Sequence, residues 1–133
     1  MLYIFTIFFR LVIQIDMNIN HSFTHYQVYY ITGNSPVTGH PQEAEIDCFL
    51  QRETPVGHEV VRKGIIYFYP DHVALPSNIH TINGIYLYFK SSRFADVMTL
   101  LKEEKPLFLS LNTISLVGHV GTGIEPVGEQ EGV

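Results

Sequence analysis

The chain is poor in the residues that carry redox, disulfide and zinc chemistry. It has one cysteine, Cys48, and no tryptophan among its 133 residues. A single cysteine excludes a disulfide within the chain and is typical of a reducing compartment. It also excludes zinc sites that are built from several cysteines.

Charged residues are scarce as well, at 16% of the chain, and basic residues are the minority among them. Eight Lys and Arg stand against thirteen Asp and Glu, which gives a net charge of −5. Three of the acids, Glu125, Glu129 and Glu131, lie near the end of the chain, and the remainder is close to neutral. The chain therefore lacks the basic patch that a duplex nucleic-acid binder normally shows.

No apolar run is long enough to cross a membrane as a helix. The most apolar stretch, MLYIFTIFFRLVIQID at residues 1–16, is interrupted by Arg10 and closed by Asp16, whereas a spanning helix needs about 20 apolar residues. A signal peptide would need a basic n-region and a small-residue cleavage site, and neither is present. The stretch is a first strand, an apolar arm that docks on the body or on a second copy, or an extension translated upstream of Met17, and the last two are favoured. We expect no membrane span and a cytoplasmic protein.

The chain ends on GHVGTGIEPVGEQEGV, whose glycines are spaced like those of a phosphate loop. A dinucleotide site needs a helix directly after the glycines, because the helix N-terminus binds the pyrophosphate. Pro126 and further glycines follow Gly123 and leave no room for such a helix. The sequence therefore predicts a last strand, an acidic flexible tail at residues 125–133, and no cofactor.

The composition predicts one folded domain. Apolar residues make up 46% of the chain, which is typical of a globular domain rather than of a disordered segment. A domain near this size buries about two-thirds of the surface of its unfolded chain. We assign residues 21–124 to a single β-rich domain and residues 1–20 to the apolar arm or upstream extension.

Alternation of apolar and polar residues predicts strands over most of this domain. The clearest case is EAEIDCFLQ, in which Ala44, Ile46, Cys48 and Leu50 face one way and Glu45, Asp47, Phe49 and Gln51 the other. Further strands are predicted at 24–32, 58–70, 85–90, 107–112 and 114–121. Gly64 predicts a bend or bulge, Asn83-Gly84 a two-residue hairpin, and Asn112-Thr113 a tight turn.

One segment has the periodicity of a helix. Phe94, Val97, Met98 and Leu101 follow at intervals of three and four residues in SSRFADVMTLLKEEKP, which places them on one face of a helix. Ser91 or Ser92 is the expected cap, and Pro106 stops the helix.

The order of elements predicts an α+β fold that is mainly β. One helix cannot cover both faces of a sheet, so we expect a strongly curved antiparallel sheet or a small barrel of five to six strands, with one amphipathic helix at about 92–104. The barrel is similar in order to five-stranded oligonucleotide- and oligosaccharide-binding barrels, although the extra hairpin departs from them. The alternative is a plain α+β sheet with the helix across one face.

The part of the chain from about residue 85 contains RFADVMTLLKEEKPLFLSLN, a short strand and GIEPVGEQE. This succession resembles small uncharacterised bacterial proteins that have a helix, a Glu-Lys-Pro stop, paired strands and a Glu-Pro-Val-Gly-Glu ending. The resemblance implies a bacterial cytoplasmic protein and brings no catalytic residue and no activity with it. Residues 1–20 lie outside it, which favours the upstream extension.

Seven histidines raise the question of a metal site, but their spacing does not support one. His21 and His25 are four residues apart, a spacing that matters on a helix, and His25 opens a predicted strand. There is no His-Glu-x-x-His motif, and the pairs His40 with Glu43 and His58 with Glu59 lack a third ligand. We assign no metal ligand.

Cys48 is the one candidate nucleophile. Its neighbours in the alternation, Ile46 and Leu50, place the thiol on the buried face of its strand, where burial raises its pKa and lowers its reactivity. Core packing is the favoured role. A small enzyme that uses Cys48 or a histidine ranks third among the functional hypotheses, and we assign no catalytic residue.

Two predicted strands carry tyrosines with neighbouring cations. The candidate binding residues are Lys63, Tyr67, Tyr69, Tyr86, Tyr88, Lys90 and Arg93. Rings that stack on bases and cations that meet phosphates form the usual platform for single-stranded nucleic acid. Tyrosine is also a common strand former at the rim of a core, and the near-neutral body weighs against phosphate binding.

A non-catalytic small binding module is therefore the leading hypothesis, with a protein partner or a second copy of the chain as its ligand. Exposed strand edges and a tyrosine-rich sheet face are typical of protein interfaces, and an apolar arm needs burial somewhere. Single-stranded nucleic-acid binding through the tyrosine, lysine and arginine face is the alternative.

Overall fold

Eight strands and one α-helix make up the part of the chain that the computed structural model describes, which is residues 17–33, 41–103 and 105–123. The strands are β1 (Asn18–Phe23), β2 (His25–Tyr30), β3 (Ala44–Thr54), β4 (Gly57–Tyr69), β5 (Ile79–Thr81), β6 (Gly84–Lys90), β7 (Leu107–Asn112) and β8 (Gly118–Thr122). A 3-10 turn, η1 (Ser91–Arg93), leads into α2 (Phe94–Glu103). The expected α+β, mainly β class is confirmed. The apolar stretch 1–16 and the acidic tail 125–133 lie outside the described residues.

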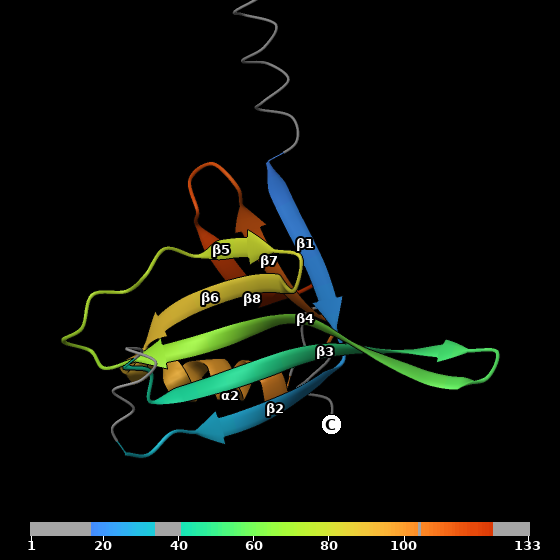
Figure 1. Cartoon of the computed structure of the whole chain (residues 1–133), viewed down its shortest axis with the longest axis horizontal. Helices are drawn as coiled ribbons and strands as arrows, with labels where there is room; N and C mark the ends of the chain where they lie inside the picture. Colours follow the sequence, from blue (N-terminus) through green and yellow to red (C-terminus); the bar gives the residue numbers. More distant parts are fainter. Residues whose placement is uncertain (1–16, 34–40, 104, 124–133) are drawn as a thin grey trace, which may run out of the picture.

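The strands form two sheets rather than one (Figure 1). A three-stranded sheet has the order β1-β7-β8, and a five-stranded sheet has the order β2-β3-β4-β6-β5. β4 and β6 run parallel, and the other pairs are antiparallel. Within the described residues neither sheet closes into the barrel of five to six strands that the sequence suggested, nor is there a single antiparallel sheet. The reason is that periodicity defines the faces of a strand but not its neighbours.

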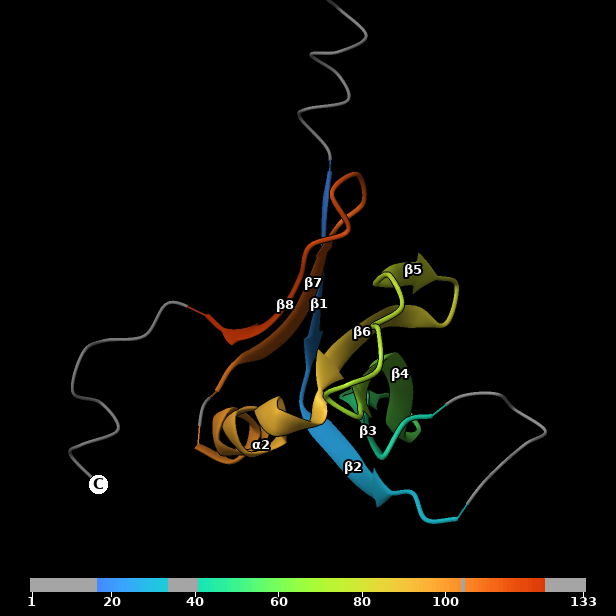
Figure 2. The ribbon, with the colours of Figure 1, turned by 90° about the vertical axis from the view of Figure 1, so that its left-hand side faces the viewer.

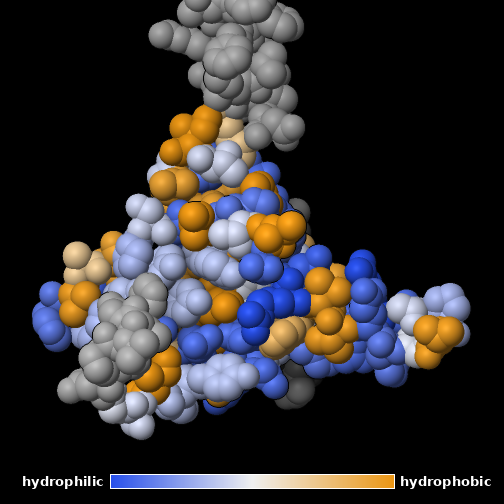
Figure 3. Space-filling view, in the orientation of Figure 1, coloured by the Kyte–Doolittle hydropathy of each residue, from blue (hydrophilic) through white to orange (hydrophobic). Residues whose placement is uncertain are grey.

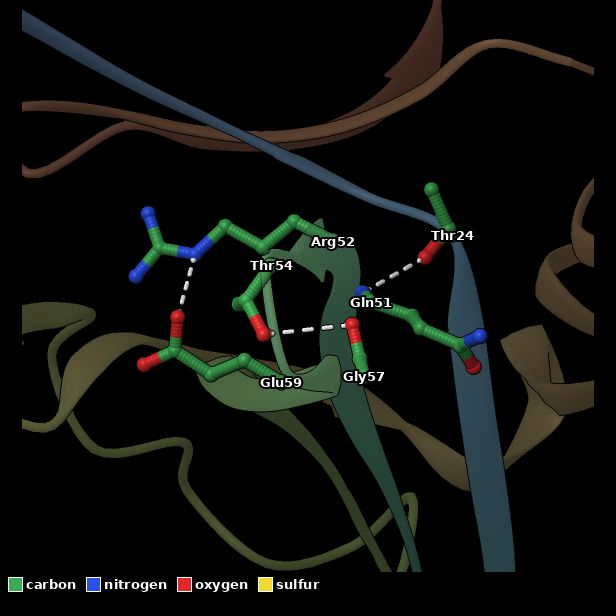
Figure 4. Close-up of polar contacts among 6 residues, drawn as sticks. All are labelled: Thr24, Gln51, Arg52, Thr54, Gly57 and Glu59. Carbon is green, nitrogen blue, oxygen red and sulfur yellow. Dashed lines mark hydrogen bonds and ion pairs between the residues drawn. The ribbon is translucent and has the colours of Figure 1, made fainter.

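Thr24 is the point at which the first long strand passes from one sheet to the other. Its backbone N–H donates to the carbonyl oxygen of Phe49 at 2.8 Å, and its Oγ1 accepts from the N–H of Gln51 at 2.9 Å (Figure 4). β1 before it pairs with β7, and β2 after it pairs with β3. Because β1 begins at Asn18, residues 18–20 belong to a sheet, although the sequence assigned them to the arm.

The predicted irregularity at Gly64 is confirmed as a β-bulge. Cys48 pairs with Gly64, but the next residue, Phe49, pairs with Arg62, so Lys63 is the extra residue of β4. A Cβ atom at Gly64 would overlap the carbonyl oxygen of Ile85 in β6. The glycine therefore permits the close approach of the parallel partner.

The predicted hairpin and helix are confirmed as well. Thr81 pairs with Gly84, so the two turn residues are Ile82 and Asn83, one position earlier than the predicted Asn83-Gly84, and Gly84 has a positive φ of 121° that favours glycine. The helix differs in its cap. The Ser92 N–H donates to Asp71 Oδ1 at 3.0 Å, so a carboxylate from the loop after β4 takes the role expected of a serine.

The turn between β7 and β8 is longer than the tight turn that the sequence suggested. Asn112 Oδ1 accepts from the N–H groups of Ile114 and Ser115, at 3.0 and 2.9 Å, and Leu116 has a φ of 61°. The last strand consequently begins at Gly118. The Asn112 side chain thus pairs two backbone N–H groups of this longer turn.

α2 and the three-stranded sheet lie on the same side of the five-stranded sheet (Figures 1 and 2). The core fills the space between them, and its members are Phe23, Ala44, Ile46, Cys48, Ile66, Phe68, Ile85, Leu87, Val97, Leu101, Leu107, Leu109 and Leu111. The burial of Ala44, Ile46 and Cys48 confirms the alternation predicted for β3. No helix within the described residues has the length and apolar character that crossing a bilayer requires.

Candidate binding site

The other face of the five-stranded sheet carries the candidate site, because no described helix or strand packs on it. We name it the tyrosine-carboxylate face, and its residues are Glu45, Asp47, Arg62, Tyr67, Tyr69, Tyr86 and Tyr88. They come from β3, β4 and β6, which are neighbours in the sheet. Figure 3 shows the molecule from the side of this face.

Strand register brings the first row of this face together. Glu45 pairs with Tyr67, and Tyr67 pairs with Tyr88. Because neighbouring strands lie about 4.8 Å apart, the three side chains stand side by side. The rings of Tyr67 and Tyr88 are stacked, with centroids 5.1 Å apart and planes 15° apart.

Two further contacts join all four tyrosines into one aromatic cluster. Tyr86 meets Tyr67 edge to face at 6.1 Å, and Tyr69 meets Tyr88 edge to face at 5.6 Å. Such geometries are the favourable ones for aromatic pairs. The cluster is a continuous aromatic surface, with Tyr69 buried and the other three rings half-buried.

Asp47 is the residue of this face whose environment is least expected. Its position in β3 points it away from the core, yet it is only 4% exposed. Arg62 Nη2 donates to Asp47 Oδ2 at 3.0 Å, and the same guanidinium lies 5.8 Å from the centroid of the Phe49 ring. With Glu45 ionised, Asp47 Oδ1 has no hydrogen-bond donor among the described residues.

The pKa of Glu45 reflects its burial and the neighbouring carboxylate of Asp47. Burial, a hydrogen bond with Asp47 and the charge of Asp47 raise the pKa of Glu45 to about 7, while Arg62 lowers it. Burial raises the pKa of Tyr67 to about 12, with a further contribution from the charge of Glu45. The pKa values of Tyr69 and Tyr88 are raised, mainly by burial. Near neutral pH Glu45 therefore exchanges a proton, whereas Tyr67, Tyr69 and Tyr88 keep theirs.

The structure places one of the three predicted cations next to the tyrosines, because Lys90 pairs with Tyr69 and shares a strand face with Tyr86 and Tyr88. Lys90 Nζ donates to the carbonyl oxygen of Val73, and Arg93 forms an ion pair with Asp96 at 3.4 Å. Lys63 is the bulge residue, and its charge contributes, after burial, to the lowered pKa of His21 in β1. The structure thus unites Tyr67, Tyr69, Tyr86 and Tyr88, with Lys90 at their edge and its ammonium directed to Val73, whereas Arg93 pairs with Asp96.

A groove of about 460 Å³ with a mixed polar and apolar lining adjoins the face at Arg62. It is lined by Phe49, Val60, Val61, Arg62, Ile82 and Asn83. Val60 is 58% exposed and Ile82 is fully exposed. Hydrophobic side chains gather on this side of the molecule, between the centre of the face and the projecting β3-β4 hairpin (Figures 1 and 3).

The sequence did not identify Glu45, Asp47 or Arg62 as site residues. The signal was partly present, because the alternation of β3 places Glu45 and Asp47 on the side opposite Cys48. What was missing was the order of the strands, since only the pairing of β3 with β4 and of β4 with β6 brings the carboxylates beside the tyrosines.

Other reactive groups do not form a site. Cys48 is fully buried, its Sγ lies 3.8 Å from the carbonyl oxygen of Ile46, and burial raises the pKa of the thiol. His21 and His80 have ring centroids 5.6 Å apart. In residues 17–33, 41–103 and 105–123 no group of three or more His, Cys, Asp or Glu side chains could hold a metal ion.

Comparison of the chain with protein-family models, with curated proteins and with solved structures gives no match.

Proposed function

We propose that the chain is a non-catalytic binding module that receives a protein partner on the tyrosine-carboxylate face and in the groove beside it. The observation that carries the proposal is the aromatic cluster of Tyr67, Tyr69, Tyr86 and Tyr88 on a sheet face that no described element covers. Tyrosine and arginine are the residues enriched at the centres of protein interfaces.

The groove adds the second half of an interface. Exposed apolar side chains beside a polar, aromatic surface are typical of a region that another protein covers. Val60 and Ile82 lie on the groove wall, and Arg62 borders both the groove and the face. A partner segment that spans both would bury an apolar side chain next to the charged pair.

A second copy of the chain is one such partner, and single-stranded nucleic acid is the alternative ligand. Stacked rings at Tyr67 and Tyr88 suit a base, whereas Glu45 and Asp47 repel phosphate. We also place the protein in the bacterial cytoplasm, a proposal supported by its single cysteine and by the resemblance of its C-terminal part.

The test is a selection of random peptides displayed on phage against the full chain, with affinities measured afterwards on synthetic peptides. The paired variant Tyr67→Ala with Tyr88→Ala removes the stacked rings. Tyr30→Ala is the matched control, because Tyr30 is 72% exposed and contacts Phe94 instead of the face. We expect selected peptides to bind wild type and Tyr30→Ala alike, and to lose at least about tenfold in affinity with the paired variant.

Chemical-shift changes in the wild-type chain locate the binding without any variant. We expect them at the amides of Glu45, Tyr67 and Tyr88. Failure of every peptide to enrich, or equal binding to all three proteins, would contradict the proposal. Salt-sensitive binding of oligo-dT that is lost with Lys63→Ala and Lys90→Ala would replace it by the nucleic-acid alternative.

A further inference from the structure

We infer that the tyrosine-carboxylate face takes a cationic side chain of the partner, a lysine ammonium or an arginine guanidinium, at the carboxylates of Glu45 and Asp47. This inference rests on the proposed function and names the chemistry that the face recognises.

The first observation is the imbalance of charge at the face. Two carboxylates, Glu45 and Asp47, lie beside one guanidinium, that of Arg62. Lys90 and Arg93 are engaged with Val73 and Asp96. Among the described residues Arg62 is the cation that lowers the pKa of Glu45, so when both carboxylates are ionised one guanidinium stands beside two negative charges.

The second observation is the unpaired oxygen of Asp47. Asp47 is almost completely buried, Arg62 occupies its Oδ2, and its Oδ1 has no donor in the described part of the chain when Glu45 is ionised, since only a protonated Glu45 can donate to Asp47. A buried carboxylate oxygen without a donor is unfavourable. Glu45 is the more exposed member of the pair, so a donor that arrives from solvent meets Glu45 first and reaches the pair from that side.

The third observation is the aromatic surface next to the carboxylates. Tyr67 stands between Glu45 and Tyr88 in the strand register and stacks on Tyr88. The faces of tyrosine rings attract cations, and the attraction is stronger where water is displaced. Carboxylates and ring faces together favour a cation, whereas an anionic ligand meets repulsion from Glu45 and Asp47.

This arrangement makes the binding depend on pH. The groups that face Glu45 are Tyr29 from β2, Asp47 from β3, Arg62 and Tyr67 from β4, and Tyr88 from β6. Glu45 has a pKa of about 7 in the free protein, so below that pH it is mainly protonated and attracts a cation weakly. A bound cation stabilises the ionised form, and binding therefore releases a proton and strengthens as the pH rises through 7.

The test uses three synthetic hexapeptides in which serine alternates with lysine, glutamine or glutamate. Their affinities for the full chain are measured by chemical-shift titration at pH 6 and pH 8, where the lysine peptide keeps its charge. We expect the lysine peptide to bind up to about tenfold more tightly at pH 8, the change in the ionised fraction of a group with this pKa. The glutamine and glutamate peptides should bind weakly at both pH values.

Glu45→Gln is the variant that removes the titrating carboxylate with little change in shape. We expect it to bind the lysine peptide weakly and without dependence on pH. Glu53→Gln is the matched control on the same strand, because Glu53 pairs with His58 on the exposed β3-β4 hairpin and should behave as wild type. The pH profile of the wild-type chain tests the inference even if a variant does not fold.

Two results would overturn the inference. Equal binding of the lysine and glutamine peptides would show that the cation is not recognised. Unchanged binding of the lysine peptide by Glu45→Gln would place the cation elsewhere. If peptides selected by display still need Tyr67 and Tyr88 for binding, the proposed function stands without this inference. If no peptide binds at the face, both the proposed function and this inference are wrong.

Discussion

Asp47 shows how a single residue can depart from the pattern that its strand obeys. Alternation places it on the polar side of β3, and the structure buries it there to 4% exposure beneath neighbouring side chains. A carboxylate in that position needs a counter-charge, and Arg62 provides one at 3.0 Å. The Arg62 side chain is 46% exposed, so its removal costs mainly through the buried carboxylate that is left without a counter-charge.

We therefore predict that Arg62→Ala lowers the free energy of unfolding by about 2–3 kcal/mol, since Asp47 loses the cation that pairs with it. Arg52→Ala is the control, because Arg52 pairs with Glu59 at 3.0 Å where both side chains are about half exposed (Figure 4). An exposed pair of this kind contributes less than about 1 kcal/mol. Urea unfolding followed by circular dichroism measures both, and equal losses would refute the role of burial.

The candidate site depends on the bulge in β4. By inserting Lys63, it shifts the register between Cys48 and Phe49, and so sets Arg62 opposite Phe49 within reach of Asp47. Gly64 beside it lets β6 approach, which places Tyr86 and Tyr88 next to Tyr67. A glycine without a Cβ is the condition for that approach.

We predict that Gly64→Ala destabilises the fold by at least about 3 kcal/mol, because the added methyl group would overlap the backbone of Ile85 and the side chain of Leu109. Gly121→Ala in β8 is the control. Nothing lies within 4 Å of a Cβ built at Gly121, and alanine is favoured over glycine in a strand, so we expect no loss of stability.

The comparison can be made by thermal and urea unfolding of the two variants. A stable Gly64→Ala protein with unchanged chemical shifts at Ile85 would show that β6 does not need the glycine.

The bend at this position could be predicted from the sequence, because a glycine within a strand pattern favours a bulge. The identity of the strand that approaches it could not, since β6 follows β4 only after a crossover.

The two sheets share one core, and this is the main property of the molecule as a whole. Leu109 of the three-stranded sheet is fully buried among residues of the five-stranded sheet, close enough that a side chain at Gly64 would overlap it. β1 pairs with β7, and their residues Asn18 and Asn112 are 94 positions apart. We therefore expect both sheets to unfold together.

We predict that Leu109→Ala lowers the free energy of unfolding by about 3–5 kcal/mol, the cost of a cavity in a core that cannot collapse. The amides of β3 and β4 and those of β7 and β8 should lose protection with the same midpoint in urea. Ile114→Ala in the exposed β7-β8 turn is the control and should cost less than about 0.5 kcal/mol. Earlier unfolding of β7 and β8 alone would show that the sheets are independent.

The sequence by itself determined the features that depend on residues close together in the chain. The buried face of β3, the bulge at Gly64, the hairpin before β6 and the helix after Ser91 follow from alternation, from helical periodicity and from backbone preferences. The four tyrosines could be recognised as candidates because the sequence pattern predicted the strands that carry them.

Only the tertiary structure decided that the strands form two sheets, that Asp71 caps the helix, and that Glu45, Asp47 and Arg62 join the tyrosines. The physical reason is that periodicity specifies which way a side chain points, whereas its neighbours across a sheet depend on pairings between distant strands that no local pattern encodes.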